Sequence, residues 1–383
     1  MRVVFPYLAQ AHQLLHSLPI AAAIAARHPR VEVHVSAASP ALLDFARRLV
    51  VRNAPAARIA FDLLPLGPGD ALRLAAGLGK SHFKQYTLLR NRGYFAGFDA
   101  VVTPERTSLF LRRIGVKARL IWTRHGAGDR EIGFADDVRD FDFVLMAGRK
   151  VEQRLLAGGL IRPGHYVSGV YAKFDWAQSA AGEALFDNTR PTVLYNPHFR
   201  PGLSSWPRFG RAVLDAFAAG GRYNLVFAPH VRLFDPPTAA DYLAFEPYQA
   251  LPHMRIDLGS ERSIDMSYTR AADLYLGDVS SQLAEFLSRP RPCLFLDAHA
   301  TAWRDDPNYR FWALGPVLTS VAGIEHELDR AIAHHSDHAA AQRLYVDETF
   351  ELEPGPSAPR GADAIVGFLA GAAKPGRNGG GNS

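Results

Sequence analysis

The sequence predicts an α/β protein made of two successive Rossmann-like halves, each with a parallel sheet, that face a central cleft. The chain has 383 residues, too many for one ordinary hydrophobic core and suited to two domains of roughly 170–190 residues. Short apolar segments alternate with amphipathic ones throughout, which is typical of βαβ units. Apolar residues make up 48% of the chain and charged residues 21%, as in globular proteins with a sizeable interior.

The first half alternates apolar strands with helices that carry an apolar stripe. Strands are expected at Val3–Phe5, Val31–Val35, 58–64, 98–102, 119–122 and 142–146. Helices are expected at Gln13–Arg27, Ala41–Arg48, Asp70–Leu78, Phe83–Arg92 and Ser108–Ile114. This half is assigned to an N-terminal domain over residues 1–168.

The second half repeats the alternation after a segment of mixed polarity, residues 169–189, which we expect to be a linker. Strands are expected at Thr192–Tyr195, Asn224–Ala228, Met254–Asp257, Leu274–Leu276 and Cys293–Leu296. Helices are expected at Trp206–Ala218, Ser263–Ala271, Ser281–Leu287 and Gly323–His335. The C-terminal domain spans 190–373, and a helix near Ala362–Ala372 is expected to cross back to the first half. The Gly/Asn-rich end, 374–383, predicts disorder.

Composition limits the class and compartment of the protein. Because no run of about 18 apolar residues lacks charge, we expect no transmembrane helix. The N-terminal residues fit a buried first strand and lack the long apolar core of a signal peptide. The single cysteine, Cys293, cannot form an internal disulfide, and its apolar neighbours predict a buried thiol in a cytoplasmic protein.

The net charge of +5 is carried mostly by arginine. Arginine binds phosphate in a bidentate manner, so phosphate-bearing substrates or anionic lipid headgroups are expected partners, although a base-composition bias also explains the excess. No basic run interleaved with aromatic residues indicates a nucleic-acid groove. The basic, aromatic segment Lys80–Arg92 fits either an anionic membrane surface or an ordinary solvated helix.

The stretch Asp278–Glu285 is the strongest local signal. It follows an apolar strand, and Ser280 or Ser281 can cap the next helix. Free backbone N–H groups, the helix dipole and two hydroxyls together favour an anion. Glu285, one turn after Ser281, is expected to face the same opening and to accept hydrogen bonds from the hydroxyls of a ribose. An ordinary capped helix with a solvent-facing glutamate fits the same residues.

A second signal is the turn Thr123–Arg130, which follows a predicted strand. Gly126 allows close backbone approach to a ligand. His125 titrates near neutral pH and suits a general base or a phosphate contact, with Arg124 and Arg130 adding positive charge. A surface turn with an exposed histidine is the alternative.

Two further predicted strands end in polar residues. His230 follows one of them, and the other is followed by Tyr195, His198 and Arg200. All these turns lie at strand carboxyl ends, where ligands bind in such sheets. Together they are therefore better evidence for a ligand site than any one of them alone. No histidine or carboxylate pair at helical spacing predicts a metal site, and no nucleophile elbow or P-loop is present.

In their order, these motifs resemble those of the CDP-glycerol glycerophosphotransferase family, which builds teichoic-acid-type polymers on a GT-B fold. The resemblance covers roughly Ile121–Asp297. The matching segments are Trp122–Arg130, Gly169–Asp175, Tyr195–Arg200, Phe227–His230 and Asp278–Glu285 with the following Arg289–Pro292. Val279 stands where the family has tyrosine.

The resemblance implies transfer of glycerol phosphate, or a similar polyol phosphate, from a CDP-activated donor to a hydroxyl on a lipid or glycan, with release of CMP. It implies His125 as the base for the acceptor, and His230 with Arg200 on the donor phosphates. Asp278 would orient its turn, Ser280 and Ser281 would bind phosphate, and Glu285 the ribose.

Under this interpretation no cofactor or metal ion is required, and the enzyme is cytoplasmic or peripheral on the inner face of the membrane. Two alternatives stay open. One is a GT-B glycosyltransferase, or a related epimerase, that uses a nucleotide sugar. The other is a non-catalytic, degenerate GT-B binding subunit.

Overall fold

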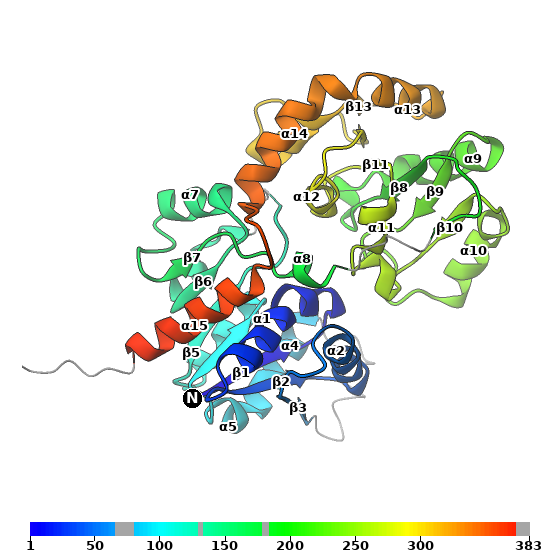
Figure 1. Ribbon diagram of the computed structural model, residues 1–383. Coiled ribbons are helices and arrows are strands. Elements are labelled where there is room, and N and C mark those ends of the chain that lie inside the picture. The colour runs from blue at the N-terminus through cyan, green and yellow to red at the C-terminus, as the bar shows by residue number, and fades with distance from the viewer. Residues whose placement is uncertain (66–79, 129–132, 178–183, 373–383) are drawn as a thin grey trace, which may run out of the picture. The chain divides into compact units, whose positions relative to one another are not determined.

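The computed structural model describes residues 1–65, 80–128, 133–177 and 184–372. The chain divides into two compact units. Unit 1 comprises Met1–His125, Phe134–Trp176 and the chain from Phe350 onward, and unit 2 comprises Gly126–Gly133 and Ala177–Thr349. Figure 1 shows the elements of both units. The expected helix over Asp70–Leu78 and the expected disordered tail over 374–383 lie outside the described residues.

Unit 1 has a seven-stranded parallel sheet in the order β3-β2-β1-β4-β5-β6-β7. Its strands are β1 (Arg2–Tyr7), β2 (Glu32–Ala37), β3 (Ile59–Leu63), β4 (Ala100–Thr103), β5 (Arg119–Thr123), β6 (Phe143–Leu145) and β7 (Tyr166–Val167). The central strands are buried on both faces, as parallel sheets require. The strand order turns around β1, because β2 lies on one side of it and β4 on the other.

Helices and short 3-10 turns connect these strands. The α-helices of unit 1 are α1 (Leu14–Arg27), α2 (Pro40–Asn53), α4 (Lys80–Arg90), α5 (Arg92–Phe95), α6 (Phe110–Arg113), α7 (Arg149–Ala157), α8 (Lys173–Trp176) and α15 (Ala358–Ala372). The 3-10 turns are η1 (Ala11–Gln13), η2 (Arg106–Leu109) and η4 (Asp136–Asp140). Ser39 caps α2, since its hydroxyl accepts the N–H of Leu42.

The C-terminal helix α15 returns to the first half of the chain, as the sequence predicts. It lies alongside α1 (Figure 1). Arg27 at the end of α1 pairs with Asp363 at 2.6 Å, and His28 contacts the same carboxylate at 2.7 Å. The last helix of the sequence therefore completes unit 1.

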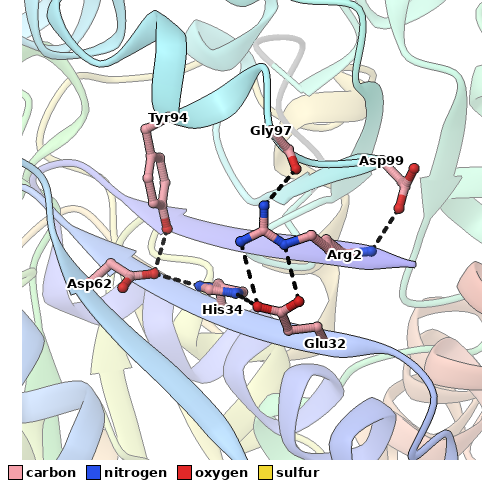
Figure 2. A network of polar contacts seen from close by, with 7 residues as sticks. All are labelled: Arg2, Glu32, His34, Asp62, Tyr94, Gly97 and Asp99. Carbon is pink, nitrogen blue, oxygen red and sulfur yellow. Dashed lines mark hydrogen bonds and ion pairs between the residues drawn. The ribbon is translucent and has the colours of Figure 1, made fainter.

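A polar network joins the strands on one side of the unit 1 sheet (Figure 2). His34 lies between two carboxylates, with Nδ1 2.6 Å from Asp62 and Nε2 2.7 Å from Glu32. Arg2 binds Glu32, and the hydroxyl of Tyr94 donates to Asp62. Arg2 and Glu32 begin their strands, so their part of the network lies toward the amino ends, away from the edge where ligands bind in such sheets, whereas Asp62 lies near the end of β3. The role of the network is to hold β1, β2 and β3 together.

Unit 2 has a six-stranded parallel sheet in the order β10-β9-β8-β11-β12-β13. Its strands are β8 (Thr192–Asn196), β9 (Asn224–Phe227), β10 (Met254–Ile256), β11 (Leu274–Gly277), β12 (Cys293–Leu296) and β13 (Val317–Leu318). Its helices and turns are η5 (Pro201–Leu203), α9 (Trp206–Ala219), α10 (Ala239–Gln249), η6 (Glu261–Ser263), α11 (Ser267–Ala271), α12 (Gln282–Phe286), η7 (Pro307–Leu314), α13 (Ile324–Ala333) and α14 (His335–Phe350).

Helix α9 illustrates how unit 2 acquires its core. Phe209, Val213 and Phe217 recur every four residues and are all buried, so one stripe of the helix faces the sheet. Each such side chain contributes roughly 1.5–3 kcal/mol on burial. The stripe packs in the same cluster as residues of β8, β9 and β11.

Sequence and structure agree on every strand expected, within one or two residues at the ends. The expected helix over Ser263–Ala271 is shorter, because Ile264 to Met266 break it and Met266 adopts a positive φ of 73°. The expected helix over Ser108–Ile114 is split into η2 and α6. The elements that were not predicted include α7, α10, β7 and β13.

Candidate functional site

Asp278 ties two strand-end loops of unit 2 together. It follows β11 directly and is 1% exposed. Its carboxylate accepts the backbone N–H groups of His198, at 2.9 Å, and Ser205, at 2.6 Å, and also the Ser205 hydroxyl at 2.9 Å. The N–H of Val279 donates to it at 2.6 Å. The loop after β8 is therefore fixed against the loop after β11, at the carboxyl edge of the sheet.

Burial raises the pKa of the Asp278 carboxyl to about 6, although the hydrogen bonds from Ser205, Val279 and His198 oppose this. At neutral pH the group is an ionised acceptor with donors on both oxygens. The indole N–H of Trp312 also donates to the Asp278 carbonyl at 2.8 Å. These contacts fix the Asp278 side chain between the two loops, and its role in orienting a donor-binding turn stays a prediction.

His198 and His230 follow the neighbouring strands β8 and β9, and their ring centroids lie 5.5 Å apart. Nδ1 of His198 accepts the backbone N–H of Arg200, and Nδ1 of His230 accepts that of Arg232, both at 3.1 Å. A neutral imidazole whose Nδ1 accepts carries its proton on Nε2. Both neutral rings therefore carry their proton on Nε2, and His198 is buried whereas His230 is half-buried.

Phe199 connects these histidines to two arginines. Its ring lies 4.6 Å from that of His230, centroid to centroid. The guanidinium of Arg232 lies 4.2 Å from the Phe199 ring centroid, and that of Arg200 lies 5.8 Å from it. The structure thus brings together three predicted residues, His198, Arg200 and His230, and adds a second cation that can neutralise phosphate.

The Ser280–Glu285 segment differs in part from its expected geometry. Ser281 stands at the N-cap of α12 but makes no capping bond with its side chain, and Ser280 Oγ instead accepts the N–H of Gln282 at 3.4 Å. Glu285 is 4% exposed, whereas Ser281 is exposed. The two side chains therefore do not share one solvent-facing surface, as had been expected, and Ser281 is the accessible member.

Tyr195 has a place in the interior. Its side chain is fully buried, packs on Phe227 with ring centroids 5.6 Å apart, and places its hydroxyl 3.1 Å from that of Ser205. Burial raises the pKa of the Tyr195 hydroxyl well above its usual value. Tyr195 therefore supports Ser205, which in turn donates to Asp278.

In unit 1, His125 follows β5, and protein groups packed around its ring desolvate it although part of the residue is exposed. Its Nδ1 lies 2.7 Å from the carbonyl oxygen of Pro104. Because a carbonyl only accepts, Nδ1 donates, and the neutral ring keeps Nε2 unprotonated. Desolvation lowers the pKa of His125, the bond to Pro104 opposes this, and Arg124, Lys84 and Arg106 lower it further. His125 is therefore an unprotonated base at neutral pH.

Two more histidine rings lie near that of His125 within unit 1. The ring centroids of His12 and His16 lie 6.1 Å and 6.2 Å from that of His125. Burial lowers the pKa of His16 well below its usual value, and repulsion from Lys173, His125 and His12 lowers it further. The surroundings of His125 thus disfavour additional positive charge.

The rest of the turn after β5 divides between the units. The guanidinium of Arg124 lies 4.3 Å from the ring centroid of Phe134 in unit 1. Gly126 belongs to unit 2 and has a φ of +73°, a region that favours glycine. Inside unit 2, a Cβ added to Gly126 would lie 3.6 Å from Ser281 Oγ. Arg130 lies outside the described residues.

Sequence reasoning missed several residues around these groups. Arg232 comes two residues after His230, and Ser205 lies 73 positions from its partner Asp278. Glu105 follows β4 just as His125 follows β5, so the strand-end rule applied elsewhere would have identified it. Lys84 belongs to the segment that fits either a membrane surface or a solvated helix, and the structure buries it beside Glu105 instead.

Within the described ranges, no group of three or more histidine, cysteine, aspartate or glutamate side chains is arranged to hold a metal ion. None of the described helices has the length and apolar character needed to cross a bilayer. A cavity of about 450 Å³ in unit 1 is lined by Phe141, Asp142 and His165 among others. These residues precede β6 and β7, so this cavity lies away from His125, which follows β5.

No protein-family model matches the chain, and no curated protein matches it in sequence. Solved structures match it in fold. A variant of the wall teichoic acid polymerase TagF with CDPG is 13% identical, with a TM-score of 0.65, and the match covers 98% of this chain and 90% of that one.

Nucleotide-sugar enzymes match equally widely. UDP-GlcNAc 2-epimerase from Neisseria meningitidis, bound to UDP-GlcNAc, is 10% identical with a TM-score of 0.60, over 96% of this chain and all of that chain (100%). The MnaA–UDP structure from S. aureus is 12% identical with a TM-score of 0.62, over 99% and 100%. The chain therefore has an α/β fold of the GT-B type, with two parallel-sheet units.

Proposed function

We propose that this protein is a transferase that moves glycerol phosphate, or a similar polyol phosphate, from a CDP-activated donor to a hydroxyl on a lipid or glycan acceptor. The observation behind this proposal is that His125 has the opposite imidazole tautomer to His198 and His230. His125 offers an unprotonated Nε2 that can accept a proton, whereas His198 and His230 offer Nε2–H groups that can donate to anionic oxygens. Transfer of a phosphoryl group to a hydroxyl is accelerated by both kinds of group, a proton acceptor for the attacking hydroxyl and donors for the phosphate oxygens.

In the proposed reaction the acceptor hydroxyl oxygen attacks the β-phosphorus of the donor. A new O–P bond forms, the bond from that phosphorus to the CMP oxygen breaks, and CMP leaves with the electron pair. Nε2 of His125 takes the hydroxyl proton. Such chemistry depends on positioning and charge stabilisation more than on covalent catalysis.

Unit 2 would hold the donor. His230, His198 and Arg200 would contact its phosphates, with Arg232 adding charge, and Ser281 offers an accessible hydroxyl. Asp278 and Ser280 would act from the interior by fixing the loops. A ribose contact through Glu285 and a phosphate contact through His198 would each require a buried side chain to become accessible, because both are 4% exposed. Arg200 and Ser281 are exposed and need no such change. The similarity in fold to TagF with CDPG supports this donor class.

A direct test is CMP release from CDP-glycerol by the purified protein, with a synthetic polyol-terminated lipid as the acceptor. The proposal expects acceptor-dependent CMP release, with transfer of the polyol phosphate to the lipid seen by mass spectrometry. Release of a nucleoside diphosphate from a UDP-sugar under the same conditions would instead identify a glycosyltransferase.

A nucleotide-sugar enzyme is the second candidate, because two of the similar folds were solved with UDP-GlcNAc or UDP. An epimerase would need acid and base groups at a sugar carbon. His125 contacts the carbonyl of Pro104, and the described carboxylate nearest to Pro104 in sequence is that of Glu105. That carboxylate is buried against Lys84. Interconversion of UDP-GlcNAc and its 2-epimer, followed by NMR, would favour this candidate, and a flat titration with every nucleotide donor would favour a non-catalytic binding subunit.

Peripheral membrane association is a separate part of the proposal, suggested by the acceptor class. Co-sedimentation with vesicles containing anionic phospholipid tests it, and Lys84 is not a suitable residue to mutate for that purpose, because it is buried. Equal recovery of the protein in the supernatant with and without vesicles would reject membrane association and leave the proposed reaction untouched.

A further inference from the structure

Lys84 and Glu105 form a buried ion pair in unit 1. Nζ of Lys84, on α4, lies 2.5 Å from Oε2 of Glu105, and the two side chains are 10% and 5% exposed. Within the described chain, no group other than Lys84 is a polar partner of either carboxylate oxygen of Glu105. Lys84 is therefore the contact that compensates the buried carboxylate. Removing one member of such a pair is costly, because the other charge stays buried.

The pair is attached to the backbone that holds His125. Glu105 follows Pro104, whose carbonyl accepts the Nδ1 proton of His125 at 2.7 Å and the indole N–H of Trp122 at 3.3 Å. The N–H of Glu105 donates to the hydroxyl of Thr103 at 3.1 Å. The Pro104 carbonyl thus lies between two fixed neighbours in the chain, and α4 fixes one of them through Lys84.

The charges around His125 come from several elements of unit 1. They are Arg124 beside it, Lys84 on α4, Arg106 on η2, His12 on η1 and His16 on α1, and Lys173 on α8 acts in turn on His16. Lys84 is among the groups that lower the pKa of His125. Glu105 carries the charge opposite to that of Lys84, so a change in either member alters the field at the ring.

We propose that Lys84 and Glu105 are a positioning pair for His125. Their ion pair anchors the Pro104 carbonyl that fixes the Nδ1–H tautomer, and the balance of their charges sets how readily Nε2 accepts a proton. Neither residue touches the substrate. The inference rests on the proposed function in assigning His125 as the base, but the tautomer and its control by the pair can be measured without any substrate.

The test follows the ring nitrogens of His125 by long-range ¹H–¹⁵N NMR in the full chain, with the His125→Ala protein used for assignment. Lys84→Met removes a cation, so the titration midpoint of His125 is expected to rise. Glu105→Gln keeps the shape but leaves the Lys84 cation unbalanced, so the midpoint is expected to fall. Lys84→Arg and Lys117→Met, which changes an exposed lysine elsewhere in unit 1, are expected to leave it unchanged.

The opposite directions distinguish the proposal from a merely structural role, which would move both variants the same way. If Lys84→Met does not fold, the fall in Glu105→Gln still decides the matter. Unchanged midpoints in both variants, or shifts of the same sign, overturn the proposal.

Turnover separates this inference from the proposed function. In an active enzyme, Lys84→Met is expected to lower kcat roughly 100-fold with little change in the KM for the donor, because the base is misplaced. Opposite NMR shifts in a protein that does not turn over CDP-glycerol would retain the pair and reject the function. Turnover of CDP-glycerol together with an unchanged His125 titration midpoint in both variants would retain the proposed function and reject the positioning pair.

Discussion

The backbone N–H of Ser205 donates to the carboxylate of Asp278 at 2.6 Å, across 73 positions of sequence. The Ser205 hydroxyl donates to the same carboxylate, and the N–H of His198 approaches it from the same loop. One buried side chain thus determines where His198 lies relative to the strand β11. Under the proposed function, this contact would fix the loop that carries His198 on the donor side.

The first prediction concerns this contact. Asp278→Asn replaces one accepting oxygen by an N–H₂ group that faces N–H donors, so one or more donors lose a partner. We expect a loss of about 1–3 kcal/mol in the free energy of unfolding and weaker binding of CDP-glycerol, both measured on the same preparation by urea denaturation and calorimetry. Asp215→Asn, which changes an exposed aspartate on α9, is the matched control. Unaltered donor binding in Asp278→Asn would contradict the role of the carboxylate.

The second prediction is the pH dependence of this carboxyl. Its pKa is raised to about 6 in the folded chain from 3.8, so between these values the native state holds more protons than the unfolded state. The contribution of Asp278 to stability is then present at low pH and is lost as pH rises through about 6. The difference in unfolding free energy between the wild type and Asp278→Asn should fall by about 1 kcal/mol from pH 5 to pH 7. A difference that grows over this range would have the wrong sign.

A third prediction concerns His125 as the base. His125→Ala should lower kcat roughly 10²–10⁴-fold while the affinity for CDP-glycerol stays close to that of the wild type. Because desolvation lowers the pKa of His125, the wild type should stay active at mildly acidic pH and lose activity only below the usual histidine value of 6.5. An acidic limb with its midpoint above 6.5, measured as log kcat against pH, would rule out this histidine in its observed surroundings.

The fourth prediction compares two exposed arginines of unit 2. Arg200→Ala removes a cation beside Phe199 and should raise the KM for the donor about 10-fold, with a smaller dependence on salt than in the wild type. Arg222→Ala removes an arginine that pairs with Glu325 and Asp329 and should leave the KM unchanged. Equal effects of the two substitutions would indicate a general effect of net charge.

A fifth prediction concerns Arg291, part of the Arg-Pro-Arg-Pro segment after α12. Its guanidinium donates to the carbonyls of Thr269, Phe286 and Ala272 and lies 3.8 Å from the Phe286 ring centroid. Arg291→Met leaves these carbonyls without their donor, and about 3 kcal/mol of stability should be lost. Arg289→Met, at an exposed neighbouring position, should cost much less. Thermal unfolding of the three proteins provides the comparison.

The strands were predictable because each is a continuous apolar run, as expected for sheets buried on both faces. The missed elements lack such a signal. Strands β7 and β13 have two residues each, too few to show a pattern. Helix α10 contains Pro247, which counts against a helix in any sequence-based assignment, and α7 buries only Val151 and Leu155.

Part of the candidate site was also predictable. His125, His198 and His230 were found because strand carboxyl ends mark the ligand-binding edge of a parallel sheet. The tautomers of these histidines could not be predicted, because each tautomer depends on one backbone contact, such as that of His125 with Pro104. The burial of Glu285 was equally hidden, since the spacing from Ser281 gives a helical face without indicating what covers it.

The central claim, a CDP-linked polyol phosphate donor, is tested most directly by titrating the purified protein calorimetrically with CDP-glycerol and with UDP-GlcNAc under identical conditions. The account predicts that CDP-glycerol binds at least about 10-fold more tightly, a difference of about 1.4 kcal/mol, and that Arg200→Ala weakens this binding. Equal affinity for the two compounds, or tighter binding of UDP-GlcNAc, would contradict it.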